Sequence, residues 1–129
     1  MPSTLVSIRR HLPSDQRRAL IEEVQRVLVD VLKTPPHDRN VRLQTFAAED
    51  FMVGPEASEY YTQVEITLYP GRPAALKREL YQALVQALGR FGVPPQDTRI
   101  ILNEVAPENW GLRGGIPGSE LIAPKKLEV

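Results

Sequence analysis

The stretch LIEEVQRVLVDVLKTPPHD, residues 20–38, recurs in outline as LYQALVQALGRFGVPPQD, residues 80–97. In both stretches apolar residues return every three or four positions, which predicts an amphipathic helix with one buried face. In both, a Pro-Pro pair follows the helical pattern, and proline cannot continue a helix. The apolar stripes are offset by 60 positions and the Pro-Pro pairs by 59. The same structural pattern is therefore repeated twice along the chain.

Each predicted helix lies between two predicted strands. Residues 4–8 and 41–46 flank the first helix, and residues 62–69 and 99–103 flank the second. Two strands of one sheet that are joined through a helix run parallel, with a right-handed crossover. Two such βαβ units predict an α/β (α+β) fold, in which a four-stranded sheet carries both helices on one face.

We expect a single domain over residues 1–129. Repeat one spans about residues 2–46, a connection follows at 47–61, and repeat two spans about 62–104. Residues 105–129 form a C-terminal extension with several glycines, whose spacing fits neither a dinucleotide-binding nor a P-loop pattern.

Local signals predict the helix ends. Ser14 is expected to be the N-cap of the first helix, because its hydroxyl can accept a hydrogen bond from the first turn. Pro73 suits the first position of the second helix, and Gly92 is expected to stop that helix.

Composition excludes several classes of protein. Sixteen basic residues balance sixteen acidic ones, and this neutrality, with few aromatics, argues against nucleic acid as the main partner. No run approaches the roughly 18 apolar residues of a membrane span, and no signal peptide is evident. The chain has no cysteine, which excludes disulfides, thiolate metal sites and a Cys nucleophile, and suits a cytoplasmic protein. His11 and His37 are too few and too isolated to predict a metal cluster.

The sheet face away from the helices is expected to hold apolar residues and to need a cover. No other part of the chain is large enough to cover this face, so the simplest prediction is that the protein self-associates through it. A monomer with a polar outer face is the alternative.

Pro2 offers unusual chemistry. Cells commonly remove an initiator methionine that precedes a small residue, and removal here would leave the secondary amine of proline at the N-terminus. Such an amine is a rigid base that can cycle its proton near neutral pH, since ordinary α-amino groups have a pKa of roughly 7.7–8.0. If Met1 persists, that amine does not exist, and many proteins carry proline at this position without a chemical role.

Four motifs stand in a specific order along the chain. They are Pro2, the Pro35–Arg39 turn, Gly71-Arg72-Pro73 ahead of the second helix, and Glu108-Asn109-Trp110. Together with the duplicated βαβ plan, they resemble the tautomerase superfamily over nearly the whole chain. The chain is most similar to the longer members, which include malonate semialdehyde decarboxylase.

The resemblance implies a role for four residues. Pro2 would be the catalytic amine, and Asp38 falls where decarboxylase-like members place an acidic residue close to that amine. Arg72 falls on the arginine that grips the substrate carboxylate, and Trp110 on the apolar wall that shields the site. The resemblance also implies chemistry without a cofactor or metal, and a homotrimer with sites near the subunit interfaces.

One departure from the decarboxylase pattern bears on the reaction. That pattern has two arginines, separated by one residue, at the start of the second helix, whereas Arg72 is followed here by Pro73 and Ala74. Arg113 in the extension is a candidate replacement for the second cation. Decarboxylation and hydrolytic dehalogenation are therefore less secure than tautomerisation.

The residues leave the direction of proton transfer open. A cation at Arg72 favours the neutral, basic form of the amine, whereas a carboxylate at Asp38 favours the protonated, acidic form. Asp38 also has a structural interpretation as a turn cap, since Asp97 occupies the matching place in the second repeat.

Three functions follow from these residues. The first is a tautomerase-like isomerase acting on a small 2-oxo or unsaturated carboxylate through Pro2. The second is a decarboxylase or dehalogenase that uses the same amine. The third is an oligomeric scaffold or small-acid binder without turnover.

Overall fold

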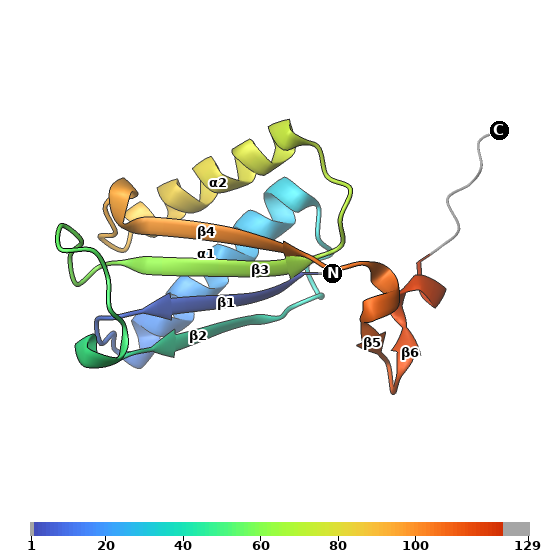
Figure 1. Ribbon diagram of the computed structural model, residues 1–129, viewed down its shortest axis with the longest axis horizontal. Helices are drawn as coiled ribbons and strands as arrows, with labels where there is room; N and C mark the ends of the chain where they lie inside the picture. Colours follow the sequence, from blue (N-terminus) through green and yellow to red (C-terminus); the bar gives the residue numbers. More distant parts are fainter. Residues whose placement is uncertain (1, 123–129) are drawn as a thin grey trace.

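The computed structural model describes residues 2–122 (Figure 1). Its main elements are β1 (Ser3–Ile8), α1 (Ser14–Leu32), β2 (Val41–Thr45), β3 (Thr62–Leu68), α2 (Ala74–Gly89) and β4 (Thr98–Glu104). Each of these strands begins and ends within one residue of the predicted position. A hairpin of β5 (Gly111–Leu112) and β6 (Ile116–Pro117) follows. Short 3-10 turns are η1 (Ala48–Asp50), η2 (Pro95–Asp97), η3 (Pro107–Asn109) and η4 (Gly118–Glu120).

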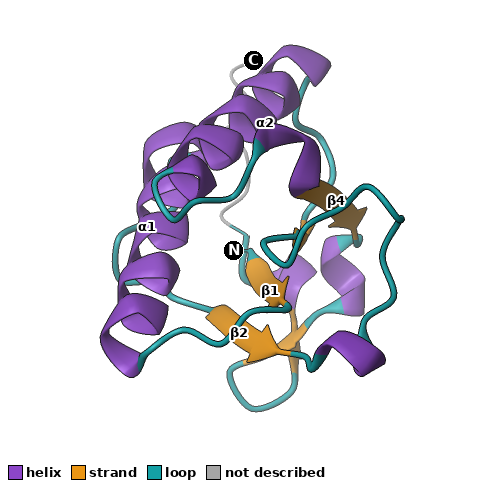
Figure 2. Cartoon of the chain, turned by 90° about the vertical axis from the view of Figure 1, so that its left-hand side faces the viewer, coloured by secondary structure: helices purple, strands orange, loops and turns teal. Residues whose placement is uncertain are grey.

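The four long strands form one sheet in the order β2-β1-β3-β4. β1 pairs with β2 in parallel and β3 with β4 in parallel, while the central pair β1–β3 is antiparallel. Both helices lie on the same side of this sheet, as the end-on view in Figure 2 shows. The predicted fold of two βαβ units with both helices on one face is confirmed.

The antiparallel central pair decides which loops share an end of the sheet. β1 begins where β3 ends, and β2 begins beside the start of β1. Because β4 runs parallel to β3, it ends there too. Four segments distant in sequence therefore meet at one end: the chain start, residues 33–40, residues 69–73 and residues 105–110 (Figure 1).

The core fills the space between the sheet and the helices. Alternate residues of the strands face inward, including Val6, Ile8, Val64, Ile66 and Leu68. They meet the apolar stripes of the helices, whose fully buried members include Leu20, Val24, Leu28, Leu80, Leu84 and Leu88. Full burial stabilises by about 1.5–3 kcal/mol for each such side chain, so the stripes hold both helices on one face.

The helix starts differ from the prediction. Ser14 is the first residue of α1, not its N-cap; Pro13 occupies the cap position, and no side chain caps the helix. The extended backbone of Pro13 (φ −59°, ψ 157°) sets the entry into the helix in its place. Pro73 likewise precedes α2 instead of opening it. Gly92 does mark the stop, because it adopts φ +86° three residues after α2 ends.

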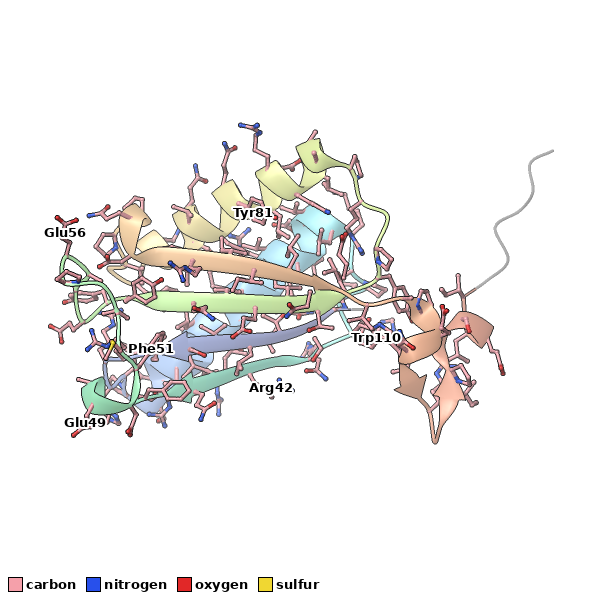
Figure 3. All side chains as sticks on the ribbon, in the orientation of Figure 1. Arg42, Glu49, Phe51, Glu56, Tyr81 and Trp110 are labelled. Atoms are coloured by element: carbon pink, nitrogen blue, oxygen red, sulfur yellow. The ribbon has the colours of Figure 1, made fainter. Side chains whose placement is uncertain are left out.

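The open face of the sheet is largely polar, which corrects the expectation of an apolar face in need of a cover. Strand alternation brings two large apolar side chains to it, Leu5 and Ile101, the latter 37% exposed. By strand alternation, the remaining outward positions are Ser3, Ser7, Arg42, Gln44, Gln63, Glu65, Thr67, Arg99 and Asn103, of which Figure 3 labels Arg42. The alternative of a polar outer face fits this part of the structure, because the apolar strand residues other than Leu5 and Ile101 point toward the helices.

A small ionic network ties the two helices together on their outer side. Glu23 of α1 binds Arg26 at 2.7 Å and also pairs with Arg90, which follows α2. The hydrogen bond from Arg26 lowers the pKa of the Glu23 carboxyl. Arg26 also binds Asp30 at 2.7 Å, so its charge is compensated twice. Among residues 2–122, no helix is long and apolar enough to cross a membrane.

Candidate active site

Pro2 lies immediately before β1, at the end of the sheet where the four segments meet. The antiparallel register pairs Ser3 with Thr67, so Pro2 lies beside the last residues of β3. Pro2 is buried. Asn40 holds the following residues in place: its Oδ1 accepts a hydrogen bond from the Ser3 hydroxyl (3.2 Å), and its carbonyl accepts one from the Thr4 N–H (2.9 Å). Met1 is outside the described residues.

Arg72 lies at the same end, in the short turn between β3 and α2. Gly71 adopts φ +119° there, a conformation that an L side chain would strain. The guanidinium Nη1 of Arg72 donates to the Tyr69 carbonyl at 3.0 Å, which directs the side chain back toward the end of β3. Within residues 2–122, Arg72 has no carboxylate partner at ion-pair distance. Its half-buried cation is therefore able to take an anionic ligand.

An aromatic pair lies at the same end of the sheet as Arg72. The rings of Tyr69 and Trp110 meet edge to face, with centroids 5.4 Å apart. The indole Nε1 of Trp110 donates to the Val105 carbonyl at 3.0 Å, so the polar edge of the ring is satisfied within the protein. Trp110 thus presents an apolar surface at this end of the sheet. Tyr69 was not predicted from sequence; its place directly after β3 and three residues before Arg72 was the available signal.

Gly118 makes the close packing of this aromatic pair possible. A Cβ at this position would lie 2.6 Å from the Tyr69 hydroxyl and 2.8 Å from the Pro107 carbonyl. The Gly118 N–H also donates to the Trp110 carbonyl at 2.8 Å. The backbone of η4 therefore lies directly against the aromatic pair.

We predict that Gly118→Ala shifts Trp110 and destabilises the fold by about 1–3 kcal/mol, the usual cost of overpacking. Urea unfolding followed by fluorescence of Trp110, the only tryptophan, measures both effects. Gly54→Ala is the matched control, because no atom lies within 4 Å of a Cβ there. Equal stability of the two variants would contradict the packing described for Gly118.

Asp38 lies between α1 and β2, two residues before Asn40 and at the same end of the sheet as Pro2. Its backbone is fixed: the N–H donates to the Pro35 carbonyl (2.9 Å), and the carbonyl accepts from Gln25 Nε2 (3.2 Å). In the part of the chain that the structure describes, its half-exposed carboxylate makes no hydrogen bond or ion pair. The carboxylate is therefore not a turn cap.

Asp97, the counterpart of Asp38, has a different environment. β4 begins beside the start of β3, so Asp97 lies at the opposite end of the sheet from Pro2. Its side chain is buried and accepts hydrogen bonds from the Ser58 N–H (3.1 Å) and the Ser58 hydroxyl. Asp97 thus anchors the connection between the repeats, which is a structural role that Asp38 does not share.

Arg113 lies apart from this group. It occupies the turn between β5 and β6 with φ 46°, and its side chain is exposed. The hairpin extends away from the sheet (Figure 1), whereas Arg72 lies in the turn between β3 and α2. Its role as a replacement for the second arginine stays a prediction.

Among residues 2–122, one end of the sheet thus carries the buried Pro2, the Asp38 carboxylate and the Arg72 guanidinium, neither of which has a charged partner there, and the Trp110 indole packed on Tyr69. Such a set can bind a small acid through the guanidinium and move protons at an adjacent carbon. Within residues 2–122, no group of three or more His, Asp or Glu side chains is arranged to hold a metal ion.

Comparison with known proteins identifies the family. A family model described as "Tautomerase enzyme" matches residues 38–113, more than half of the chain. The chain belongs to this tautomerase family. A second model with the same description matches residues 6–60, so both repeats carry tautomerase sequence. A curated relative, "Probable tautomerase RSp0893" of Ralstonia nicotianae, is 33% identical over 64 residues, which are 49% of this chain and 90% of the relative.

Solved structures of tautomerase relatives share the fold over most of their length. FG41 malonate semialdehyde decarboxylase, inhibited by 3-bromopropiolate, is 25% identical with a TM-score of 0.79, covering 88% of this chain and 91% of that one. A fused 4-OT described as a symmetric trimer is 27% identical with a TM-score of 0.79, covering 90% and 95%. The resemblance to the tautomerase superfamily, with decarboxylase-like relatives, is confirmed.

Proposed function

We propose that this tautomerase-family protein is a cofactor-independent isomerase that acts on a small 2-oxo or unsaturated carboxylate. Pro2, after loss of Met1, is the general acid–base group. The observation that carries the proposal is the meeting of Pro2 and Arg72 at one end of the sheet, created by the antiparallel β1–β3 pair. The family match supports an enzyme of the tautomerase kind, and the site residues give it a mechanism.

The proposed proton transfer uses one base twice. The guanidinium of Arg72 binds the substrate carboxylate through two parallel hydrogen bonds and fixes the orientation of the carbon chain. The neutral amine of Pro2 removes a proton from the carbon next to the carbonyl and returns it to another atom of the resulting enol. Trp110 and Tyr69 exclude water from one side, which strengthens the attraction between Arg72 and the substrate.

We further propose that the working assembly is a homotrimer. The fused 4-OT relatives described as trimers support this.

The test is ketonisation of an arylpyruvate enol, followed by its absorbance, with protein whose intact mass shows that Met1 is absent. Saturable acceleration over buffer is expected. 3-Bromopropiolate, the inhibitor of the decarboxylase relative, should abolish this activity by adding to the Pro2 amine, with one adduct on the N-terminal peptide. Binding of small acids without turnover or adduct would instead favour the scaffold function.

Decarboxylation is the second candidate, supported by the unpaired carboxylate of Asp38 and by the similarity to malonate semialdehyde decarboxylase. In this mode Pro2 is protonated and acts as an acid. The pH profile separates the two candidates, because the neutral amine predominates above its pKa. Activity that rises with pH through this pKa supports the tautomerase; activity that falls supports the decarboxylase.

A further inference from the structure

A groove runs between α1 and the edge strand β2. Its volume is about 1160 Å³. Half-buried apolar side chains of Ile21, Val29 and Val41 form part of its lining. β2 is the outermost strand on this side of the sheet, so its outer backbone groups have no strand partner. An open strand edge beside an apolar groove is a surface that folded proteins normally cover.

The rim of this groove is strongly basic. Arg17, Arg18, Arg39 and Arg42 line it, against the single acid Glu22. Arg26 also lines it, but Glu23 and Asp30 compensate its charge. The groove therefore favours an acidic occupant. Gln25 Oε1 is buried in the groove wall without a hydrogen-bond donor among the described residues, so the occupant should also present an N–H group.

The connection between the repeats, residues 47–61, has the matching properties. It contains Glu49, Asp50, Glu56 and Glu59 and no lysine or arginine. Met52 is 95% exposed at its surface, an extreme value for an apolar side chain. Figure 3 shows Glu49, Phe51 and Glu56 together at the end of the molecule, away from the Pro2 end.

The connection is also held in one shape. Phe51 packs edge to face between Phe46 and Tyr61, with centroids 5.6 and 5.8 Å apart. Asp97 anchors its far end through Ser58. A preorganised segment loses little conformational entropy when it docks, so the acidic connection is suited to binding as a rigid knob.

We propose that the basic groove of one copy of this chain receives the acidic connection of the next copy, head to tail. The chain has no net charge, yet these two surfaces carry opposite charges, and complementary patches on one molecule produce a heterologous contact that can close into a ring. This docking rests on the proposed trimer and would be the contact between its neighbouring subunits. Asn40 lines the groove and also binds Ser3, so the docked connection adds a neighbour's residues beside the Pro2 end.

Charge reversal tests this contact. Arg18→Glu with Arg42→Glu reverses the groove, and Glu49→Arg with Asp50→Arg reverses the knob; all four side chains are exposed and make no hydrogen bond within residues 2–122. Sedimentation equilibrium should show that each pair weakens association by about tenfold or more, since like charges then face one another across the contact. Arg78→Glu, an exposed position on α2 outside the groove, is the control and should leave association unchanged.

Combining the two charge reversals tests whether these surfaces meet each other. The protein with all four reversals should assemble as the wild type does, and an equimolar mixture of the two double variants should co-assemble. High salt should weaken the wild-type assembly through the same charges. A wild-type trimer that tolerates either reversal would overturn the docking proposal and leave the trimer standing. Dissociation without rescue would also overturn the docking, and a monomeric wild type would overturn both.

Discussion

Pro2→Ala is expected to lower kcat/KM for enol ketonisation by about 10²- to 10⁴-fold, the range that one positioned acid–base group contributes. Alanine leaves a primary amine on a freer backbone, in place of a secondary amine that its own ring holds in position. Pro2 is buried and lies beside the end of β3, so its surroundings also restrict the ring. Stopped-flow absorbance with the mature variant measures the loss.

The control for this experiment is Ser3→Ala, which removes the hydrogen bond to Asn40 but keeps the proline amine. Its kcat/KM should change only a few-fold. Intact mass must show that Met1 is absent in both variants, because an acylated proline nitrogen is not a base. Full activity in Pro2→Ala, or in protein that retains Met1, would exclude Pro2 as the catalytic group.

Arg72→Ala is expected to lower kcat/KM by about 10²-fold. A hydrogen bond to a charged group is worth about 1.5–3 kcal/mol, and each 1.4 kcal/mol corresponds to a factor of ten. Arg72→Lys keeps the charge without the planar fork and should fall between wild type and Arg72→Ala. Arg78→Ala, on the exposed side of α2, is the control for loss of a cation.

The methyl ester of the substrate separates carboxylate binding from a structural effect. The ester has no anionic group for Arg72, so wild type and Arg72→Ala should process it at similar rates. An equal loss with acid and ester would show that Arg72 supports the fold of the turn, through its bond to the Tyr69 carbonyl, and not the substrate.

The spacing of apolar residues along the sequence was sufficient to predict most of the fold. The stripes of α1 and α2 and the crossover rule were sufficient for two parallel pairs. The expectation of an apolar open face was wrong because Val64, Ile66 and Leu68 alternate strictly and leave the polar residues Gln63, Glu65 and Thr67 on the other face. Cap assignment failed at Ser14 because a preceding proline can occupy the cap position without a side-chain hydrogen bond.

The candidate site shows a different limit. Asp38 and Asp97 follow identical Pro-Pro pairs, so their sequence context cannot distinguish them. The antiparallel central pair does, because it sends one carboxylate to the end with Pro2 and the other to the end with Ser58. Tyr69 was missed for a related reason: its contact with Trp110 joins residues 41 positions apart, and no local pattern reports such a contact.

The two repeats differ in the residue at the start of their first strand. At the 60-residue offset, Thr62 is the counterpart of Pro2, and its nitrogen is part of a peptide bond, which has no basicity to offer. Under the proposed mechanism, only the end of the sheet that carries Pro2 can therefore host the proton transfer. The opposite end of the sheet instead carries Asp97, whose side chain binds Ser58 of the acidic connection.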